Sequence, residues 1–189
     1  MKISILDGGL ADQTTDAIRM LLIDVCSQQG DQVQPFVLRN QKIAYCLGCF
    51  ECWTKTPGRC RIEDEGQAIA AAIIHSDLVI YLTPITFGGY SSALKKAVDR
   101  TICLISPFFT KIHGEVHHRK RYTRYPNLLG IGLLPQPDPE QAAIFTKLVE
   151  RNAINFHAPI HASLVLERTT DWATVQTQVQ ALVEKGKAH

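Results

Sequence analysis

Residues 78–91 read LVIYLTPITFGGYS, and this stretch decides the fold. Residues 78–82 are almost wholly apolar, which is typical of a strand buried on both faces of a parallel sheet. A loop of Pro, Gly and aromatic residues follows the strand, and segment 92–104 then predicts a helix. A strand, a loop and a helix in succession make the repeating unit of an α/β protein.

The same alternation runs along the rest of the chain. Strands are predicted at 2–6, 33–38, 78–82, 128–134 and 162–166. Helices are predicted at 14–28, 65–75, 92–104, 139–157 and 171–185. The clearest helix start is Asp138-Pro139-Glu140-Gln141, which places Asp at the N-cap, Pro at N1 and Gln at N3. The pattern predicts a doubly wound α/β fold.

Five strands separated by helices predict a mainly parallel sheet with right-handed crossovers and the strand order 2-1-3-4-5. In open sheets of this kind the ligand lies at the carboxyl ends of the strands, where the strand order reverses. That point falls between the first and third strands. The loops at 7–15 and 83–91 are therefore the predicted ligand site.

Length and composition indicate a single domain, 1–189, with 46% apolar and 20% charged residues. Two connections, 39–64 and 106–127, are too long to be mere turns. The net charge of +2 is too small to indicate nucleic acid or an anionic membrane as the main partner. The sequence shows no signal-peptide pattern and no membrane-spanning apolar run, so we expect a cytoplasmic protein with reduced thiols.

The first predicted loop, 7–15, contains Gly8 and Gly9 and leads to Thr14 and Thr15 at a helix start. Glycines allow a sharp turn, and hydroxyl groups beside unpaired helix N–H groups can bind a phosphate. The loop can equally be an ordinary turn in which Thr14 caps the helix. Taken alone it favours the ordinary turn, because its two aspartates would repel a phosphate and no Lys or Arg in the loop offsets them.

The loop after the third strand has the composition of a binding loop. Its residues are Thr83, Pro84, Ile85, Thr86, Phe87, Gly88 and Gly89, followed by Tyr90 and Ser91. The proline makes the loop rigid, the two glycines let the backbone approach a flat ligand, and the aromatic side chains can stack on or flank a ring. The alternative is a turn whose aromatic residues cap the core. The position of the loop at the predicted ligand site favours binding.

A cluster of cysteines occupies the connection 39–64. Cys46, Cys49 and Cys52 follow one another at C-x2-C spacing, and Cys60 comes shortly after them. This spacing can wrap one [4Fe–4S] cluster. Zinc is the second interpretation, because zinc sites more often use two separate C-x2-C pairs. The third is a structural loop of reduced thiols without metal.

Segment 111–124 carries His113, His117 and His118 among five Lys and Arg residues. Such a run is usually a solvated face, although metal ligation or a nucleotide-phosphate site is an alternative. The sequence lacks a dinucleotide fingerprint and a nucleophile elbow. No side chain stands out as a catalytic acid or base.

Two motifs together resemble a known family. They are Cys46-x2-Cys49-x2-Cys52 with Pro57-Gly58-x-Cys60 and Glu63-Asp64, and Thr83-Pro84-Ile85-Thr86-Phe87-Gly88-Gly89-Tyr90-Ser91 with Leu94-Lys95. The chain from its first strand to about residue 159 resembles the NADPH-dependent FMN reductase family of flavodoxin-like proteins. Within that family it is most similar to the iron–sulfur flavoproteins. Its first loop differs from the family pattern in lacking the usual Ser and Arg.

The resemblance implies a flavodoxin-like fold and bound FMN, with NAD(P)H or a protein as the electron donor. It implies that the first loop, including Gly8 and Gly9, holds the phosphate through Thr14 and Thr15. It implies that residues 83–89 line the flavin ring, and that Cys46, Cys49, Cys52 and Cys60 hold a [4Fe–4S] cluster. It also implies a homodimer or homotetramer. Two rival functions are an FMN electron carrier without NAD(P)H activity of its own and a non-catalytic zinc or thiol interaction module.

Overall fold

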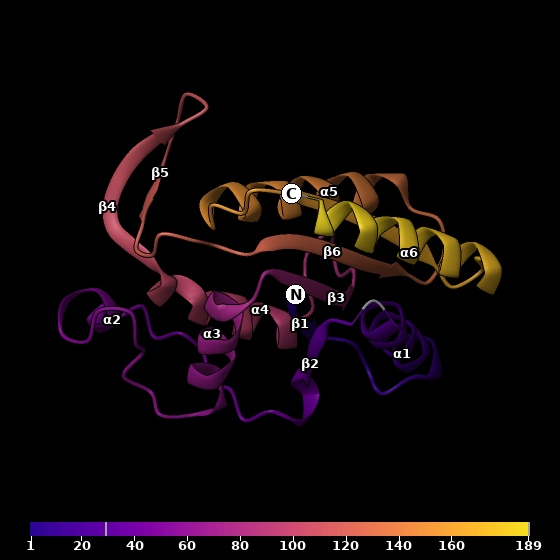
Figure 1. Cartoon of the computed structure of the whole chain (residues 1–189), viewed down its shortest axis with the longest axis horizontal. Helices are drawn as coiled ribbons and strands as arrows, with labels where there is room; N and C mark the ends of the chain where they lie inside the picture. Colours follow the sequence, from indigo (N-terminus) through magenta and orange to yellow (C-terminus); the bar gives the residue numbers. More distant parts are fainter. Residues whose placement is uncertain (29, 189) are drawn as a thin grey trace.

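Five parallel strands form the central sheet, in the order β2-β1-β3-β6-β7 (Figure 1). The structure is a computed structural model that describes residues 1–28 and 30–188. The strands are β1 (Lys2–Asp7), β2 (Gln32–Val37), β3 (Leu78–Pro84), β6 (Asn127–Leu134) and β7 (His161–Glu167). Because β6 and β7 are the predicted fourth and fifth strands, the predicted order 2-1-3-4-5 and the flavodoxin-like fold class are confirmed.

Helices cover both faces of this sheet. They are α1 (Gln13–Gln28), α3 (Glu65–His75), α4 (Ser92–Arg100), α5 (Pro139–Asn155) and α6 (Trp172–Lys187). Apolar residues of α1 and α6 pack with Ile5 and Ile80 on one face. Apolar residues of α3, α4 and α5 pack with Val79 and Tyr81 on the other. Neighbouring residues of β3 thus point to opposite faces and are buried on both, as expected for a central parallel strand.

The structure differs from the sequence expectation over 106–127, which is mostly an antiparallel hairpin rather than a loop. Its strands are β4 (Ile105–Ile112) and β5 (Glu115–Lys120). The turn between them is His113-Gly114, with φ of 51° and 84°. Two positive φ values are what a tight two-residue hairpin turn requires. The many charged residues of 111–124 favour the interpretation of a solvated face, and the turn-forming pair His113-Gly114 is easily overlooked among them.

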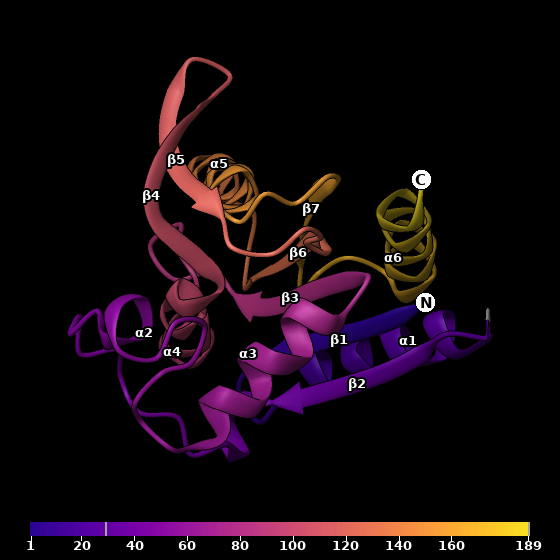
Figure 2. The same ribbon diagram turned by 60° about the vertical axis from the view of Figure 1, so that its left-hand side comes forward.

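The hairpin stands at the side of the molecule next to α5 (Figure 2). Arg151 of α5 forms an ion pair with Glu115 beside the hairpin turn, and Nε2 of His157 lies 2.7 Å from the carbonyl oxygen of His118. Since a carbonyl only accepts, the His157 nitrogen is the donor. These contacts hold a two-stranded element that would be marginal alone.

The connection 39–64 is largely irregular. It contains the 3-10 turn η1 (Leu38–Asn40) at its start and the short helix α2 (Glu51–Thr54). The predicted helix 92–104 ends at Arg100 and continues as the 3-10 turn η2 (Thr101–Leu104). Over residues 1–28 and 30–188, no helix has both the length and the apolar character needed to cross a membrane.

Candidate functional site

The structure brings the two predicted ligand loops together at the carboxyl edge of the sheet. The Gly8 amide donates to the carbonyl of Leu82 at 2.8 Å, and the Ser91 hydroxyl donates to the carbonyl of Gly8 at 2.7 Å. A side chain at Gly8 would place its Cβ 2.6 Å from the Cβ of Leu94. Only glycine permits this approach, so residue 8 joins the loops rather than facing a ligand.

The β3 loop ends in a tight turn from Thr86 to Gly89. Thr86 and Gly89 exchange two backbone hydrogen bonds, of 3.0 and 2.9 Å. The two residues between them, Phe87 and Gly88, have φ of 50° and 75°. The Phe87 side chain is 95% exposed at the tip of the turn. The rigid turn thus presents an aromatic ring to solvent at the carboxyl edge of the sheet, where ligands of open α/β sheets bind.

The predicted residues of the β3 loop divide into supporting and surface positions. Thr83, Ile85 and Gly88 are buried. Thr86 and Phe87 are exposed, and Pro84 and Gly89 are partly exposed. The Thr83 hydroxyl accepts from the Ser91 amide at 3.0 Å and so closes the base of the loop. We infer that the exposed and partly exposed residues are placed to meet a ligand directly, and that the buried residues support the loop.

The first loop is closed by an aspartate. Helix α1 begins at Gln13, and the carboxylate of Asp12 accepts from the Thr15 amide at 3.1 Å and from the Thr15 hydroxyl at 3.0 Å. Asp12 is therefore the N-cap of α1, and the predicted capping by Thr14 is wrong. Thr15 is buried, and its amide and hydroxyl donors both bind Asp12. Thr14 is partly exposed and lines a cavity of about 270 Å³ with Arg168 and Trp172.

Three arginines offset the acidic residues of the first loop, although none lies in the loop itself. Arg19 pairs with the fully buried Asp7 at 2.6 Å, and Arg168 lies 3.5 Å from Asp12. Arg19 and Arg39 both bind Asp16, at 2.7 and 2.8 Å. Hydrogen bonds from Arg39 and Arg19 lower the pKa of Asp16 below its ordinary value. The sequence conceals these partners because they come from α1, η1 and the segment after β7.

The geometry fits the two ends of an FMN molecule differently. At the ring end, Phe87 of the β3 loop and Leu10 of the first loop are exposed, and Gly89 in the same turn as Phe87 is partly exposed. At the phosphate end, the Asp12 carboxylate already takes the donors of Thr15 that a phosphate would use. Only Thr14 remains open to a cavity. The ring end fits FMN, and the phosphate end fits only if Asp12 moves or an arginine compensates for it.

Four cysteines line a second, small cavity. Cys46, Cys49, Cys52 and Cys60 surround it together with Ile102 and Arg100. All four thiols are free; Cys52 is buried, Cys49 is exposed, and the other two are partly exposed. Burial raises the pKa of Cys52, and the neighbouring thiols Cys60, Cys46 and Cys49 raise it further. In the part of the chain that the structure describes, no three His, Cys, Asp or Glu side chains already stand in a metal-binding arrangement.

Aromatic residues anchor the cysteine segment to the hairpin. The rings of Phe50 and Trp53 stack with centroids 5.0 Å apart, and Trp53 lies 5.0 Å from the ring of His118. The Trp53 indole N–H donates to the carbonyls of Ile102 and Ile105 at 2.9 and 3.0 Å. These contacts hold the middle of the cysteine segment against η2 and the hairpin.

Arg100 forms a charged wall of the cysteine cavity. Its side chain is 1% exposed and binds both carboxylate oxygens of Asp64 at 2.9 Å. Burial opposes the charged form of Arg100, but the hydrogen bonds to Asp64 and the interaction with the Cys60 side chain raise its pKa. The Nε of Arg100 is buried without a hydrogen-bond partner. A buried cation with an unused N–H group beside four thiols fits an anionic iron–sulfur cluster.

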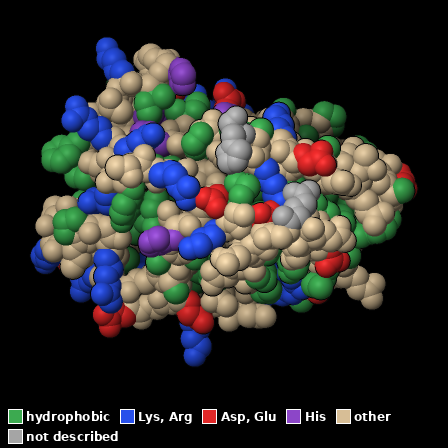
Figure 3. All heavy atoms as spheres, viewed as in Figure 1, with side chains coloured by type: hydrophobic (Ala, Val, Ile, Leu, Met, Phe, Trp, Pro, Cys, Tyr) green, Lys and Arg blue, Asp and Glu red, His purple; other side chains and the backbone are tan. Residues whose placement is uncertain are grey.

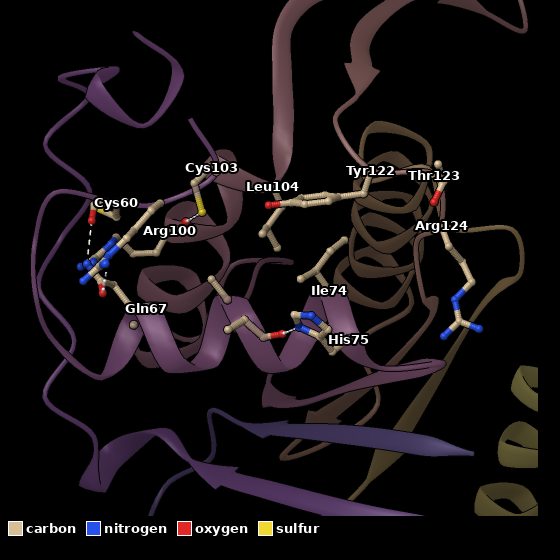
Figure 4. A pocket seen from close by; sticks show the side chains of 15 residues that line it. Cys60, Gln67, Ile74, His75, Arg100, Cys103, Leu104, Tyr122, Thr123 and Arg124 are labelled. Carbon is tan, nitrogen blue, oxygen red and sulfur yellow. Dashed lines mark hydrogen bonds between the residues drawn. The ribbon is translucent and has the colours of Figure 1, made fainter. Parts of the chain in front are cut away.

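Arg100 and Cys60 also line a larger cavity of about 510 Å³, between α3 and residues 122–124 (Figure 4). Its apolar side includes Ile74 and Leu104. Sequence reasoning missed this cavity and Arg100. The only signal was an Arg at the end of an amphipathic helix, which ordinarily predicts a solvated side chain.

The basic side chains of 111–124 mainly support the hairpin. Arg119 and Arg121 donate to the carbonyls of Phe109 and Ile105, and Arg124 pairs with Asp77 at 2.6 Å. Lys111 and Lys120 are exposed. These contacts support the interpretation of a solvated face for the lysines and give the three arginines structural partners.

One family model matches more than half of the chain. The model of the NADPH-dependent FMN reductase family matches residues 1–121. An iron–sulfur flavoprotein of Methanocaldococcus jannaschii is 31% identical over 88 residues, which cover 47% of this chain and 44% of that protein. Another from the same organism is 27% identical over 116 residues, covering 61% and 58%. The chain spans about half the length of these curated relatives.

Solved structures share the fold. An NAD(P)H:quinone oxidoreductase from Methanothermobacter marburgensis has a TM-score of 0.71 at 10% identity, covering 100% of this chain and 98% of the other. An FMN-dependent NADH-azoreductase from Bacillus anthracis, solved with FMN, has a TM-score of 0.65 at 13% identity, covering 97% and 95%. At these identities the likeness concerns the fold alone.

Proposed function

Since this chain belongs to the NADPH-dependent FMN reductase family, we propose that it is an FMN-dependent oxidoreductase. Loops 7–15 and 83–91 would hold the flavin between them, and the electrons would come from NAD(P)H or from a protein donor. We propose that the whole chain, 1–189, works as a single domain. FMN supplies the electron chemistry when bound, and the protein binds it, orients it and sets its surroundings.

The observation that carries this proposal is that the two loops are hydrogen-bonded to each other at the place where the strand order of the sheet reverses. Gly8 and Ser91 fix one loop on the other, and the turn at Phe87 is held open to solvent by its own hydrogen bonds. A flat ring lying against this edge would cover Phe87 and Leu10, which are 95% and 63% exposed. Covering such surface is worth about 25 cal/mol per Å².

The residues then have separate roles. The ring of Phe87 and the backbone of Thr86 and Gly89 would contact the flavin, and Thr14 would hold its phosphate. Thr83 and Ser91 hold the loop in shape. No side chain is assigned as a catalytic acid or base.

We further propose that Cys46, Cys49, Cys52 and Cys60 hold a [4Fe–4S] cluster. Four free thiols around one cavity, beside a buried guanidinium group, support this assignment. The described thiols do not yet stand in a metal-binding arrangement, so the segment would adjust when a cluster binds. Metal binding and ordering of the segment are therefore expected to be coupled.

The hairpin side is proposed to join copies of the chain into a dimer or tetramer. Phe108, Phe109 and Val116 are 68%, 60% and 65% exposed. Figure 3 shows apolar and basic side chains interleaved over the side of the molecule that carries the hairpin. Exposed apolar side chains gathered on one projecting element are typical of an interface.

The phosphate end gives a test of the flavin site. Asp12→Asn is expected to tighten FMN binding about 5- to 30-fold, because it removes a negative charge worth about 1–2 kcal/mol of repulsion from the phosphate. Asn caps helices as well as Asp, so α1 is expected to remain intact. Fluorescence titration with FMN measures the change, and riboflavin, which lacks the phosphate, is the control.

Riboflavin affinity is expected to stay within about twofold of the wild-type value, since no phosphate is present to respond to the lost charge. An equal gain for both flavins would place the phosphate away from Asp12. Failure of the wild-type protein to bind either flavin saturably would contradict the proposed function itself.

A further inference from the structure

Arg100 is a buried cation whose binding capacity is only partly used. It extends from the last turn of α4 toward the cysteine segment, where Figure 4 shows it beside Cys60 and Gln67. Its two terminal nitrogens donate to Asp64, to the carbonyl of Ala44 at 3.0 Å and to that of Ile62 at 3.1 Å. Every donor direction but one is therefore engaged by the protein.

The remaining donor is the Nε–H group, which is buried and makes no hydrogen bond of ordinary geometry. The Cys60 side chain nevertheless interacts with the same guanidinium group, so the nearest acceptor available to this group is a sulfur atom. Buried donors in proteins are nearly always satisfied, and leaving one unmade costs about 1–3 kcal/mol. The cavity that Arg100 lines offers sulfur rather than oxygen: its wall includes Cys46, Cys49, Cys52 and Cys60. A thiolate or a cluster sulfide is an acceptor of the right kind at this place.

The fold keeps the guanidinium group in position. Asp64 caps α3 and binds Arg100 through both oxygens, which fixes the plane of the fork. A side chain at Gly66 would place its Cβ 3.3 Å from Cζ of Arg100, so glycine leaves room for the group. Because both terminal nitrogens of the planar guanidinium group bind Asp64, the direction of its Nε–H bond is fixed as well.

We propose that Arg100 is a positioning residue that sets the reduction potential of the cluster held by the four cysteines, through its charge and through an N–H···S hydrogen bond from Nε. This inference rests on the cluster part of the proposed function. Four thiolates make the site anionic, and reduction adds a further negative charge. A buried cation and a hydrogen bond to sulfur both stabilise the reduced form, so they raise the potential.

The test compares two substitutions in the same ion pair, using the full chain reconstituted with iron and sulfide. Arg100→Lys keeps a positive charge and can still pair with Asp64, but it removes the Nε donor. Asp64→Asn weakens the same pair but keeps the guanidinium group and its Nε. The midpoint potential of each is measured by anaerobic titration, and the iron–sulfur stretching bands by resonance Raman spectroscopy.

Arg100→Lys is expected to reduce the ratio of reduced to oxidised cluster about tenfold at a fixed potential, which is about 59 mV for a one-electron couple. Its iron–sulfur bands are expected to shift as the hydrogen bond is lost. Asp64→Asn is expected to leave the potential unchanged or to raise it, because an anion has been removed.

Three results would overturn the inference. The first is an unchanged potential and unchanged bands in Arg100→Lys. The second is a fall of the same size in both variants, which would show that the pair only maintains the shape of the loop. The third is loss of iron uptake in both variants while the wild-type protein binds iron normally. If the wild-type protein takes up no iron, both the proposed cluster and this inference are wrong. The proposed flavin site is tested separately, by the FMN titration.

Discussion

Cys49→Ser is expected to abolish the uptake of iron and sulfide, with the wild-type chain binding about four irons under the same anaerobic conditions. The four thiols line one cavity, and Cys49 is its exposed member. Serine is a poor ligand for iron, so three thiolates would remain and the cluster would lack a ligand. Flavin binding is expected to be unchanged, because the flavin loops lie on other elements.

The matched control is Cys26→Ala. Cys26 is buried in α1 on the opposite face of the sheet, where burial raises its pKa to about 11. It takes no part in the cavity, so iron uptake is expected to be normal. Metal analysis for iron, sulfide and zinc together distinguishes a cluster from a zinc site. Equal iron content in Cys49→Ser and the wild-type protein would show that the cysteines do not act as one ligand set.

Gly88→Val is expected to have the second large effect, because it lowers the stability of the fold as well as the affinity for FMN. Gly88 has φ of 75°, and an added Cβ would lie 2.4 Å from Cγ2 of Ile144. Left-handed strain and overpacking together cost about 2–5 kcal/mol. For a chain of this size the melting temperature is expected to fall by about 5–20 °C. Differential scanning fluorimetry without flavin measures this loss.

Gly89→Ala separates flavin contact from stability. An added Cβ at Gly89 meets only the carbonyl of Thr86, at 3.4 Å, which is an ordinary contact. The melting temperature is therefore expected to change by less than about 2 °C. The affinity for FMN is expected to fall, because the methyl group obstructs the approach of the ring to the backbone of the turn. Unchanged FMN affinity in Gly89→Ala would move the ring away from this turn.

The sheet could be predicted from the sequence because each strand has its own hydrophobic signal. The run 78–82 is buried on both faces, and the strong start at Asp138 marks α5, where the Asp138 carboxylate accepts from the Gln141 amide at 3.0 Å. Periodicity and capping are local properties, so a single sequence carries them. The strand order followed from general rules of α/β topology.

The electrostatics of the site could not be predicted in the same way. Asp12 and Thr14 are both good capping residues, and only three-dimensional geometry decides which one caps α1. Arg19, Arg39 and Arg168 reach the acidic loop from three separate segments. Pairing across such distances in sequence depends on tertiary packing, which no local pattern records.

Anaerobic addition of NADPH to the FMN-loaded protein tests the central claim most directly. The visible absorption of oxidised FMN is expected to bleach at once and to return when oxygen is admitted. Dithionite serves as the reference for complete reduction. An FMN-loaded protein that dithionite bleaches but neither NADPH nor NADH reduces would contradict an NAD(P)H-dependent oxidoreductase and would favour an electron carrier supplied by a protein donor.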